Sequence, residues 1–398
     1  MKNSFTLFIM ILLAGLSVRA QDINVPKVFA AAEKQTELML KEIPGSKEGK
    51  PQLVSPRTLD KGELKLVSSR DWTSGFFPGQ LWFLYEYTGK SKWKESAEEF
   101  TAFIEKEKLN SGTHDMGFKI FCSFGTGFRL TNDQQYKDVI IQSAKTLTTR
   151  FRPITGTIRS WDHNRDKWGF PVIIDNMMNL ELLFAATRFT GDSSFYNIAV
   201  THANTTMKNH YREDNSSFHV IDYDTVTGKV LKRNTHQGFS HESAWSRGQA
   251  WGLYGFTMCY RETKNNDYLL QAEKIAAFML DHANMPKDLV PYWDYNAPGI
   301  PIEPRDASAA AILASGLYEL SMYSQNGKRY RAAADKIVQN LTSSYRSPIG
   351  ENKGFILLHS TGSKPANSEV DVPLNYADYY YLEAVLRAKK LKEKRPFY

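Results

Sequence analysis

A short polar junction that recurs between apolar segments constrains the fold of this chain more than any other feature. Gly89, Asn132 and Gly191 each end one helix-compatible segment, and a second such segment follows directly. Glycine and asparagine accept the left-handed conformation that closes a helix, and the Ser or Asp that follows can cap the next helix. Each junction therefore predicts a pair of antiparallel helices. Two weaker copies follow at residues 262–268 and 323–330.

The spacing of these junctions indicates how many helical pairs the chain forms. They recur at intervals of roughly 40–70 residues, as expected for helical pairs that are separated by variable loops. A first helix is expected at residues 25–42 and a closing helix at 375–390, which brings the count close to six pairs. The clearest strand pattern is residues 217–223. We therefore predict an all-α fold, an (α/α)6 barrel, in which residues 21–398 form a single domain.

The first twenty residues have the layout of a secretory signal peptide. Lys2 precedes an apolar run at residues 7–13, and the small residue Ala20 closes the segment. This run is about half as long as a membrane span, and no comparable run occurs later. We therefore expect residues 1–20 to be removed and the mature protein to be periplasmic, without a membrane partner.

Composition excludes two further classes of protein. Cys122 and Cys259 are too few for a disulfide-built scaffold, and we interpret them as buried free thiols. The formal charge of +7 comes from Lys and Arg residues that are spread along the chain. Nucleic-acid binding needs basic residues that cluster in a patch, so no nucleic-acid partner is expected. The positive net charge is also compatible with an anionic small substrate. The oligomeric state stays open.

Polar and aromatic residues gather just before the expected starts of several helices. These segments are residues 70–76, 113–118, 173–179 and 243–251. A lone Asp in such a place is often a helix cap, which is the alternative interpretation of Asp115 and Asp175. Asp175, however, lies between Ile174 and Met177 in an apolar setting that raises the pKa of a carboxyl group and favours the neutral acid. A second carboxylate nearby would raise it further, as in the carboxyl pairs of glycoside hydrolases.

Histidines in the same loops raise the question of a metal site. His236 and His241 are five residues apart, which does not suit one face of a helix, and no His-Glu-x-x-His run is present. A glycine-rich phosphate loop and the Gly-x-Ser-x-Gly motif of serine hydrolases are also missing from the sequence. We therefore predict an enzyme with neither a catalytic metal nor another cofactor.

Four motifs together resemble those of one enzyme family. The strings HDMGF, IIDNMMNL, THQGF and SAWSRGQAWGLYGF are similar, in this order, to those of the unsaturated glucuronyl hydrolases, glycoside hydrolase family 88. The likeness extends from about Asp71 to Leu386. It implies an (α/α)6 barrel that needs no metal and acts on the sugar ends left by polysaccharide lyases.

The resemblance also implies roles for individual residues. The general acid/base falls on Asp175 and its companion carboxylate on Asp115. Substrate-contacting positions of the family match His219, Gln237, Trp245, Arg247, Trp251 and a stacking wall at Trp72. For the aromatic residues the alternative is core packing. For Arg247, which we expect to bind the substrate carboxylate, the alternative is a structural arginine bonded to loop carbonyls.

A late loop carries a partial signal for sulfate. Ser360, Ser363 and Lys364 lie where sulfate-tolerant members of the family place a serine and lysine cluster. The likeness is partial because Ser363 and Lys364 are adjacent, and a solvated loop is the alternative. Sulfated chondroitin- or heparin-type substrates are therefore compatible with this loop.

The expected chemistry explains why these residue types are needed. A lyase product ends in a ring whose C4=C5 double bond is conjugated to the ring oxygen, so protonation at C4 gives an oxocarbenium-like cation. A neutral Asp175 can supply that proton and then accept one from the water that adds at C5. The predicted function is removal of a terminal unsaturated uronic acid from acidic oligosaccharides, with the glycosaminoglycan type favoured. The alternatives are an unsaturated rhamnogalacturonyl hydrolase acting on pectin fragments and a non-catalytic glycan-binding toroid.

Overall fold

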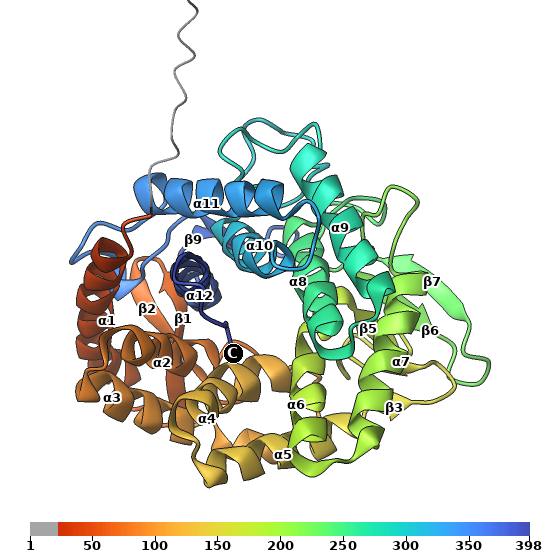
Figure 1. The fold of residues 1–398 in the computed structure, drawn as a ribbon, viewed down its shortest axis with the longest axis horizontal. Coiled ribbons are helices and arrows are strands. Elements are labelled where there is room, and N and C mark those ends of the chain that lie inside the picture. Colours follow the sequence, from red (N-terminus) through yellow and green to blue (C-terminus); the bar gives the residue numbers. More distant parts are fainter. Residues whose placement is uncertain (1–22) are drawn as a thin grey trace, which may run out of the picture.

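The computed structural model describes residues 23–398, so the predicted signal peptide at residues 1–20 lies outside the described residues. Twelve α-helices in this range alternate between an inner and an outer ring (Figure 1). The inner helices are α2 (Phe76–Thr88), α4 (Thr126–Thr131), α6 (Leu180–Thr190), α8 (Ser246–Thr263), α10 (Ala307–Leu320) and α12 (Asn375–Lys392). The outer helices are α1 (Val25–Lys47), α3 (Ser91–Ala102), α5 (Gln134–Thr148), α7 (Ser193–Asn209), α9 (Asn266–Asp281) and α11 (Gly327–Ser344). This arrangement confirms the predicted (α/α)6 barrel.

The five predicted junctions each join an inner helix to the outer helix that follows it. Gly89, Asn132 and Gly191 adopt the expected left-handed conformation, with φ of 67°, 57° and 74°. Lys264 takes the same conformation at φ 58°, although a β-carbon makes it less favourable than in glycine. The side chain of Asp133 accepts a hydrogen bond from the backbone of the next outer helix, as a cap should. The local signals in the sequence therefore determine the helical pairs.

Burial differs sharply between the two rings. All residues of α10 are buried, because this helix has protein on every side. The outer helix α11 buries residues at intervals of three and four, the spacing of a single helical face. These buried residues are Tyr330, Ala334, Ile337, Val338 and Leu341. The continuous apolar character of the inner helices thus reflects their place inside the ring.

Short strands, most of which the sequence analysis did not predict, lie in connections that lead from an outer helix to the next inner helix. They are β1 (Leu53–Asp60), β2 (Glu63–Ser68), β3 (Phe151–Arg152), β4 (Thr157–Ile158), β5 (Pro171–Ile173), β6 (Val220–Tyr223), β7 (Val230–Asn234), β8 (Ser360–Ser363) and β9 (Ser368–Val372). Three pairs form antiparallel hairpins, and β5, β6 and β7 form a three-stranded antiparallel sheet. The strand predicted at residues 217–223 is β6, with shorter bounds. Because these connections precede the inner helices, they gather at the rim where the inner helices begin.

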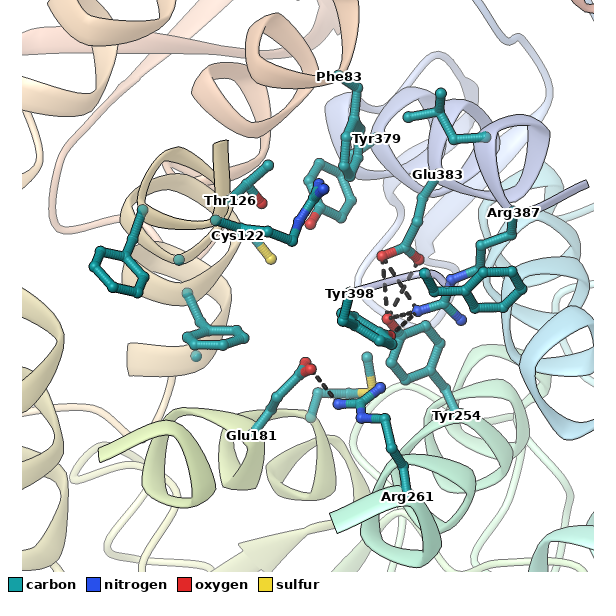
Figure 2. Close-up of a pocket in the computed structure, with 18 of the residues that line it drawn as sticks. Phe83, Cys122, Thr126, Glu181, Tyr254, Arg261, Tyr379, Glu383, Arg387 and Tyr398 are labelled. Atoms are coloured by element: carbon teal, nitrogen blue, oxygen red, sulfur yellow. Dashed lines mark hydrogen bonds and ion pairs between the residues drawn. The ribbon is translucent and has the colours of Figure 1, made fainter. Parts of the chain in front are cut away.

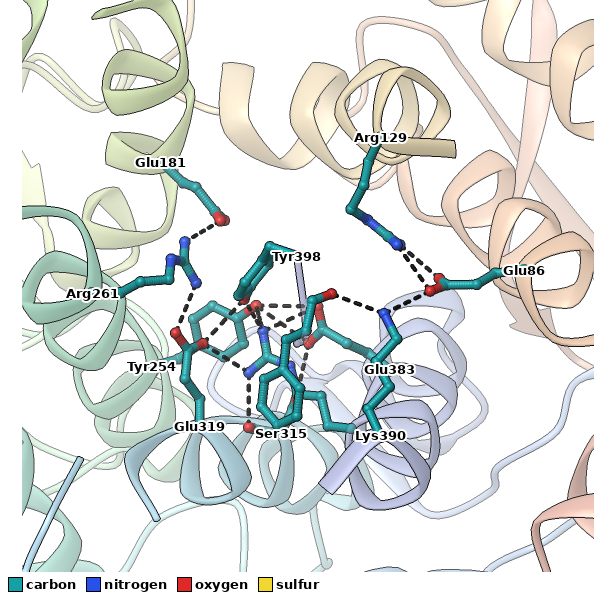
Figure 3. Close-up of polar contacts among 12 residues, drawn as sticks. Glu86, Arg129, Glu181, Tyr254, Arg261, Ser315, Glu319, Glu383, Lys390 and Tyr398 are labelled. Atoms are coloured by element: carbon teal, nitrogen blue, oxygen red, sulfur yellow. Dashed lines mark hydrogen bonds and ion pairs between the residues drawn. The ribbon is translucent and has the colours of Figure 1, made fainter. Parts of the chain in front are cut away.

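The opposite end of the barrel, where the inner helices end, is closed by charged side chains and by the last residues of the chain (Figures 1 and 3). Phe397 is buried there, and the Tyr398 hydroxyl accepts a hydrogen bond from Arg387 and donates one to Glu319 at 3.0 Å. A cavity of about 440 Å³ lies inside this end, lined in part by Cys122 and by tyrosines of α8 and α12 (Figure 2). The last residues therefore form part of the wall of this cavity.

Two further predictions concern the described part of the chain. Cys122 and Cys259 are both free thiols, but Cys122 is only partly buried. Among residues 23–398, no helix is both long enough and apolar enough to cross a membrane.

Candidate active site

The predicted general acid/base, Asp175, lies at the rim where the inner helices begin. It belongs to a 3-10 turn, Ile174–Asn179, that connects β5 to α6. Ile174 and Met177 on either side of it are fully buried, and Asp175 itself is 7% exposed. Within the part of the chain that the structure describes, its Oδ2 atom has no hydrogen-bond partner. A buried carboxyl oxygen without a partner is unusual and indicates a group that binds or reacts with a ligand.

The protonation of Asp175 follows from this environment. Burial raises the pKa of the carboxyl group to about 7, and the negative charge of Asp115 acts in the same direction. The guanidinium of Arg247 and the indole of Trp251 oppose the shift. Asp175 can therefore hold a proton near neutral pH and release it in the same pH range, which is what a group that acts first as acid and then as base requires.

A close contact between two chain segments brings Asp115 to the same place. Asn179, in the turn of Asp175, accepts hydrogen bonds at 2.8 Å and 3.3 Å from the backbone of Gly117 and Phe118. A β-carbon on Gly117 would lie 2.6 Å from the Cα of Asn179, so this approach requires glycine. Asp115 precedes the π-helical segment Gly117–Gly125 (η2), and its side chain is 18% exposed. Its carboxylate contacts His114 Nε2 at 3.2 Å.

His219 faces Asp175 from the start of β6. Its Nδ1 atom accepts hydrogen bonds from the backbone of His236 and Gln237, both at 3.1 Å. An Nδ1 that accepts carries no hydrogen, so the neutral ring bears its hydrogen on Nε2. This Nε2 lies 3.7 Å from Asp175 Oδ2. Burial holds the pKa of His219 well below its usual value, and the nearby His236 and Arg247 lower it further. The ring is therefore neutral.

The predicted aromatic residues divide into one partly exposed and two buried side chains. Trp72 is partly exposed and packs against Phe76, Phe118 and Tyr376 at centroid distances of 5.7, 5.4 and 4.9 Å. Trp245 and Trp251 are 3% and 0% exposed. Trp72 can therefore offer a face to a sugar, whereas Trp251 is packed into the core, in line with the alternative of core packing.

Arg247, predicted to bind a substrate carboxylate, is 1% exposed. Its Nη1 atom donates to Asp306 at 2.8 Å and to the Thr361 carbonyl at 2.6 Å, and Nη2 donates to the Gly362 carbonyl at 2.6 Å. These partners match the alternative of a structural arginine bonded to loop carbonyls. The binding of a substrate carboxylate by Arg247 stays a prediction.

The same bonds place the predicted sulfate loop beside the site. Gln237 Nε2 also donates to the Gly362 carbonyl, at 3.0 Å. Ser360 is fully buried, whereas Ser363 and Lys364 are partly exposed at the end of β8. The hairpin β8–β9 thus presents Ser363 and Lys364, but not Ser360, toward solvent.

Three residues of this region were not identified as site residues from the sequence. Asp306 caps α10 and accepts hydrogen bonds from Ser308, and an Asp before the alanine-rich run is a signal that could have identified it. Tyr376 has a buried hydroxyl without a partner in the described chain, and no sequence signal distinguishes it from the neighbouring tyrosines. The ring of Trp161 lies 5.5 Å from that of His236 and 6.3 Å from that of His219. Trp161 therefore extends the aromatic lining of the rim.

Several buried polar atoms around Arg247 and Asp175 have no hydrogen-bond partner within residues 23–398. They include Asp175 Oδ2, His219 Nε2, Trp251 Nε1, Ser360 Oγ and the Tyr376 hydroxyl. Most buried polar groups in folded proteins are paired, so this concentration indicates a site for a polar ligand. No group of three or more His, Cys, Asp or Glu side chains suited to a metal ion occurs in the same part of the chain. The prediction that no metal takes part stays a prediction.

Comparisons with known proteins agree with this geometry. Residues 50–390 match the model of Glycosyl Hydrolase Family 88. A protein of Formosa agariphila, named unsaturated glucuronyl hydrolase, is 50% identical over 94% of this chain and 92% of its own length. An unsaturated chondroitin disaccharide hydrolase of Streptococcus agalactiae is 32% identical over 82% of this chain and 83% of its own length. The crystal structure of an unsaturated glucuronyl hydrolase specific for heparin matches with a TM-score of 0.86 and 45% identity, covering 91% of this chain and 98% of that chain.

Proposed function

This chain belongs to glycosyl hydrolase family 88, and we propose that it removes the terminal Δ4,5-unsaturated uronic acid from oligosaccharides released by polysaccharide lyases. One observation carries this proposal. Asp175 is a buried carboxyl group with a pKa of about 7 and an unpaired oxygen at the rim of the barrel. Protonation of a vinyl ether needs a neutral acid near neutral pH, and Asp175 has the required properties.

The reaction proceeds by hydration of the double bond. Asp175 transfers its proton to C4, and the positive charge that develops at C5 is shared with the ring oxygen. Water then adds to C5 and gives its proton to the Asp175 carboxylate. The resulting hemiketal opens, and the hemiacetal left at C1 expels the remainder of the oligosaccharide. Asp175 ends the cycle protonated, and no covalent bond to the enzyme forms.

Asp115 and His219 both assist this cycle. The negative charge of Asp115 favours the protonated form of Asp175 before the first step and stabilises the cation after it. The Nε2 atom of His219 lies 3.7 Å from Asp175 Oδ2, and its hydrogen can be donated to the carboxylate or to the attacking water once substrate is bound. Trp72 offers a stacking face for the unsaturated ring, and Gln237 orients the neighbouring hairpin β8–β9.

Acidic glycosaminoglycan fragments are the proposed substrates. Relatives named for heparin and for chondroitin disaccharides support this class, at 45% and 32% identity. Ser363 and Lys364 are accessible at the end of β8, where they can meet a sulfate group. Arg247 and Asp306 bind the backbone of this hairpin.

The decisive experiment follows the near-ultraviolet absorbance of the double bond over a panel of lyase products. We expect the absorbance of unsaturated heparin or chondroitin disaccharides to disappear on addition of the protein. Faster loss with unsaturated rhamnogalacturonan disaccharide would instead identify a pectin enzyme. An unchanged absorbance with every substrate would identify a glycan-binding protein and contradict the proposal.

We also propose that the protein is exported to the periplasm without residues 1–20, supported by the layout of that segment. The proposed mechanism uses the side chains of the site and no metal or cofactor. Cell fractionation and N-terminal sequencing of the native protein test the location. A cytoplasmic protein that retains Lys2 would contradict it.

A further inference from the structure

A groove rich in arginine lies beside the candidate active site and has no part in the chemistry above. Its volume is about 510 Å³, and its charged lining residues are Arg150, Arg152, Arg159 and Asp162. The sequence shows these residues only as scattered charges, whereas β3, β4 and the following loop bring them together. Three guanidinium groups therefore line one groove with a single carboxylate.

The bonding of Asp162 shows that positive charge is in excess here. Its carboxylate contacts Arg150 at 2.9 Å and Arg159 at 3.2 Å, and its backbone carbonyl accepts a hydrogen bond from Arg165. Arg152 is exposed and has no carboxylate partner within residues 23–398, and the buried Nε of Arg159 is unbonded. Burial lowers the pKa of Arg159, and three neighbouring arginines lower it further against the opposing charge of Asp162. The cluster thus carries more positive charge than the single carboxylate of Asp162 balances.

The closed end of the barrel provides the contrast within the same molecule. Arg129 there forms two hydrogen bonds with Glu86, at 2.8 and 2.6 Å (Figure 3). Arg261 is bonded to Glu319 at 2.8 Å and also contacts Glu181 (Figure 3). It contacts Glu262 as well, at 2.9 Å. At the closed end each of these arginines therefore contacts at least one glutamate, whereas in the groove Arg150 and Arg159 share the single carboxylate of Asp162.

The position of the groove connects it with the oligosaccharide site. Its lining residue Ser111 is four residues from Asp115, which limits the separation of their Cα atoms to about 14 Å even for an extended chain. Arg159 is two residues from Trp161, and the intervening Ser160 accepts a hydrogen bond from the His114 backbone. Phe170, also in the lining, leads through β5 to Asp175. The groove is thus within reach of a short oligosaccharide whose unsaturated end lies at Asp175.

We propose that this groove is a second binding site for the anionic groups, sulfate or carboxylate, of sugars beyond the one that carries the unsaturated ring. The inference rests on the proposed function, because it extends the site for the acidic oligosaccharide. Arg152 and Arg159 present guanidinium forks that match sulfate and carboxylate oxygens. Arg150 holds the groove together, since it donates to the carbonyls of Ser111 and Arg159.

The test compares substrates of two lengths in the variant Arg152→Gln/Arg159→Gln. Loss of charge-assisted hydrogen bonds should raise the KM for a sulfated unsaturated tetrasaccharide by about tenfold or more, with kcat unchanged. The KM for the unsulfated unsaturated disaccharide should stay the same, because that substrate does not reach the groove. The control Arg329→Gln removes one of the same charges from the outer helix α11 and should change neither value. An equal effect on both substrates, or no effect on the tetrasaccharide, would overturn the proposal.

A binding measurement separates this inference from the proposed reaction. A saturated sulfated tetrasaccharide has no double bond, and calorimetry reports its affinity whether or not the protein is a hydrolase. We expect the double variant to weaken this affinity by about tenfold. The inference then stands even if no unsaturated substrate is turned over. If the variant instead loses only the binding of inorganic sulfate and keeps its affinity for the tetrasaccharide, the groove binds free anions and the proposal is wrong.

Discussion

Arg247 and Asp306 form a buried ion pair at the rim of the barrel, with 2.8 Å between Nη1 and Oδ2 and exposures of 1% and 0% for the two side chains. The pair joins the start of α8 to the start of α10, and Arg247 also bonds the Thr361 and Gly362 carbonyls of β8. Three connections that are far apart in the sequence are thereby held together. Both members of the pair thus bond the hairpin β8–β9, since the Thr361 backbone also donates to Asp306 at 3.3 Å.

Arg247→Ala is therefore expected to destabilise the protein. Removal of one partner of a buried ion pair leaves the other charge uncompensated, at a cost of about 3–5 kcal/mol in the free energy of unfolding. Asp306→Ala should cost a similar amount, and the double variant should lose less than the sum of the two. Denaturant unfolding measures all three. If Arg247→Ala keeps its stability but loses activity toward the uronate and not toward its methyl ester, Arg247 binds the substrate carboxylate as first predicted.

Asp175→Asn should abolish turnover, because an amide cannot donate and then accept the proton. The expected loss in kcat is about 10²–10⁴-fold, measured by the decrease in double-bond absorbance. Asp378→Asn is a matched control. Burial raises the pKa of Asp378 as well, to about 8, but its carboxylate accepts hydrogen bonds from the backbone of Ile356 and Leu357. That variant should keep a rate within a few-fold of the parent. A similar rate in Asp175→Asn would assign the proton transfer to another group.

The rate should depend on pH through Asp175. In the proposed mechanism the reaction begins from the protonated acid, so kcat/KM should fall as the pH rises through about 7, the pKa of this carboxyl group. Because the charge of Asp115 raises that pKa, Asp115→Asn should move the alkaline limb to lower pH. A pH–rate profile of both proteins measures the shift. A limb that moves to higher pH in Asp115→Asn would contradict this arrangement of charges.

The free energy of unfolding should also change with pH as Asp175 titrates, and the direction of that change can be predicted. The pKa of Asp175 is raised in the folded protein, so its contribution to stability is complete below the ordinary pKa of Asp and is lost as the pH rises through about 7. Asp175→Asn removes this loss and should make the protein more stable than the parent at pH 8, by on the order of 4 kcal/mol at most. Unfolding at pH 4 and pH 8 tests this. A variant whose relative stability is the same at both values would show that Asp175 is not neutralised by the fold.

His219 should be neutral and carry its hydrogen on Nε2 from pH 5 to pH 8. The two backbone donors at Nδ1 select this form, and burial holds the pKa of the ring well below its usual value. The ¹⁵N chemical shifts of the ring distinguish the two neutral forms and the cation. A ring that is protonated at pH 6, or that carries its hydrogen on Nδ1, would remove His219 as a donor toward Asp175.

The closed end of the barrel should contribute to stability without affecting the reaction. Tyr398→Phe leaves the buried Arg387 and Glu319 with one hydrogen bond fewer each, which should cost about 1–3 kcal/mol. Tyr323→Phe is the matched control, because its hydroxyl reaches the same Glu319 at a longer 3.4 Å and should matter less. Both variants should retain the parent kcat. A tenfold lower kcat in Tyr398→Phe, measured with a disaccharide, would show that the two ends of the barrel are coupled.

Local patterns in the sequence determine the helical pairs and the character of Asp175. A junction such as Thr88-Gly89 closes one helix and starts the next through conformations of a few neighbouring residues, so no distant contact is needed to predict it. The apolar neighbours of Asp175 are likewise adjacent in sequence, and the expected rise of its pKa follows from them. These features were predicted correctly because their physical causes are local.

The partners of buried charges depend on the tertiary structure alone. Arg247 lies 59 residues from Asp306 and 115 from Gly362, and a sequence pattern does not show which of these a guanidinium will meet. The strands β8 and β9 are short, and their pairing is stabilised by neighbours that only the closed barrel supplies. The excess of arginine around Asp162 also arises from folding, because charge balance is set by neighbours in space. The sequence by itself therefore determined the helical ring and the apolar setting of Asp175, while the tertiary structure decided how the charged residues at the rim are paired.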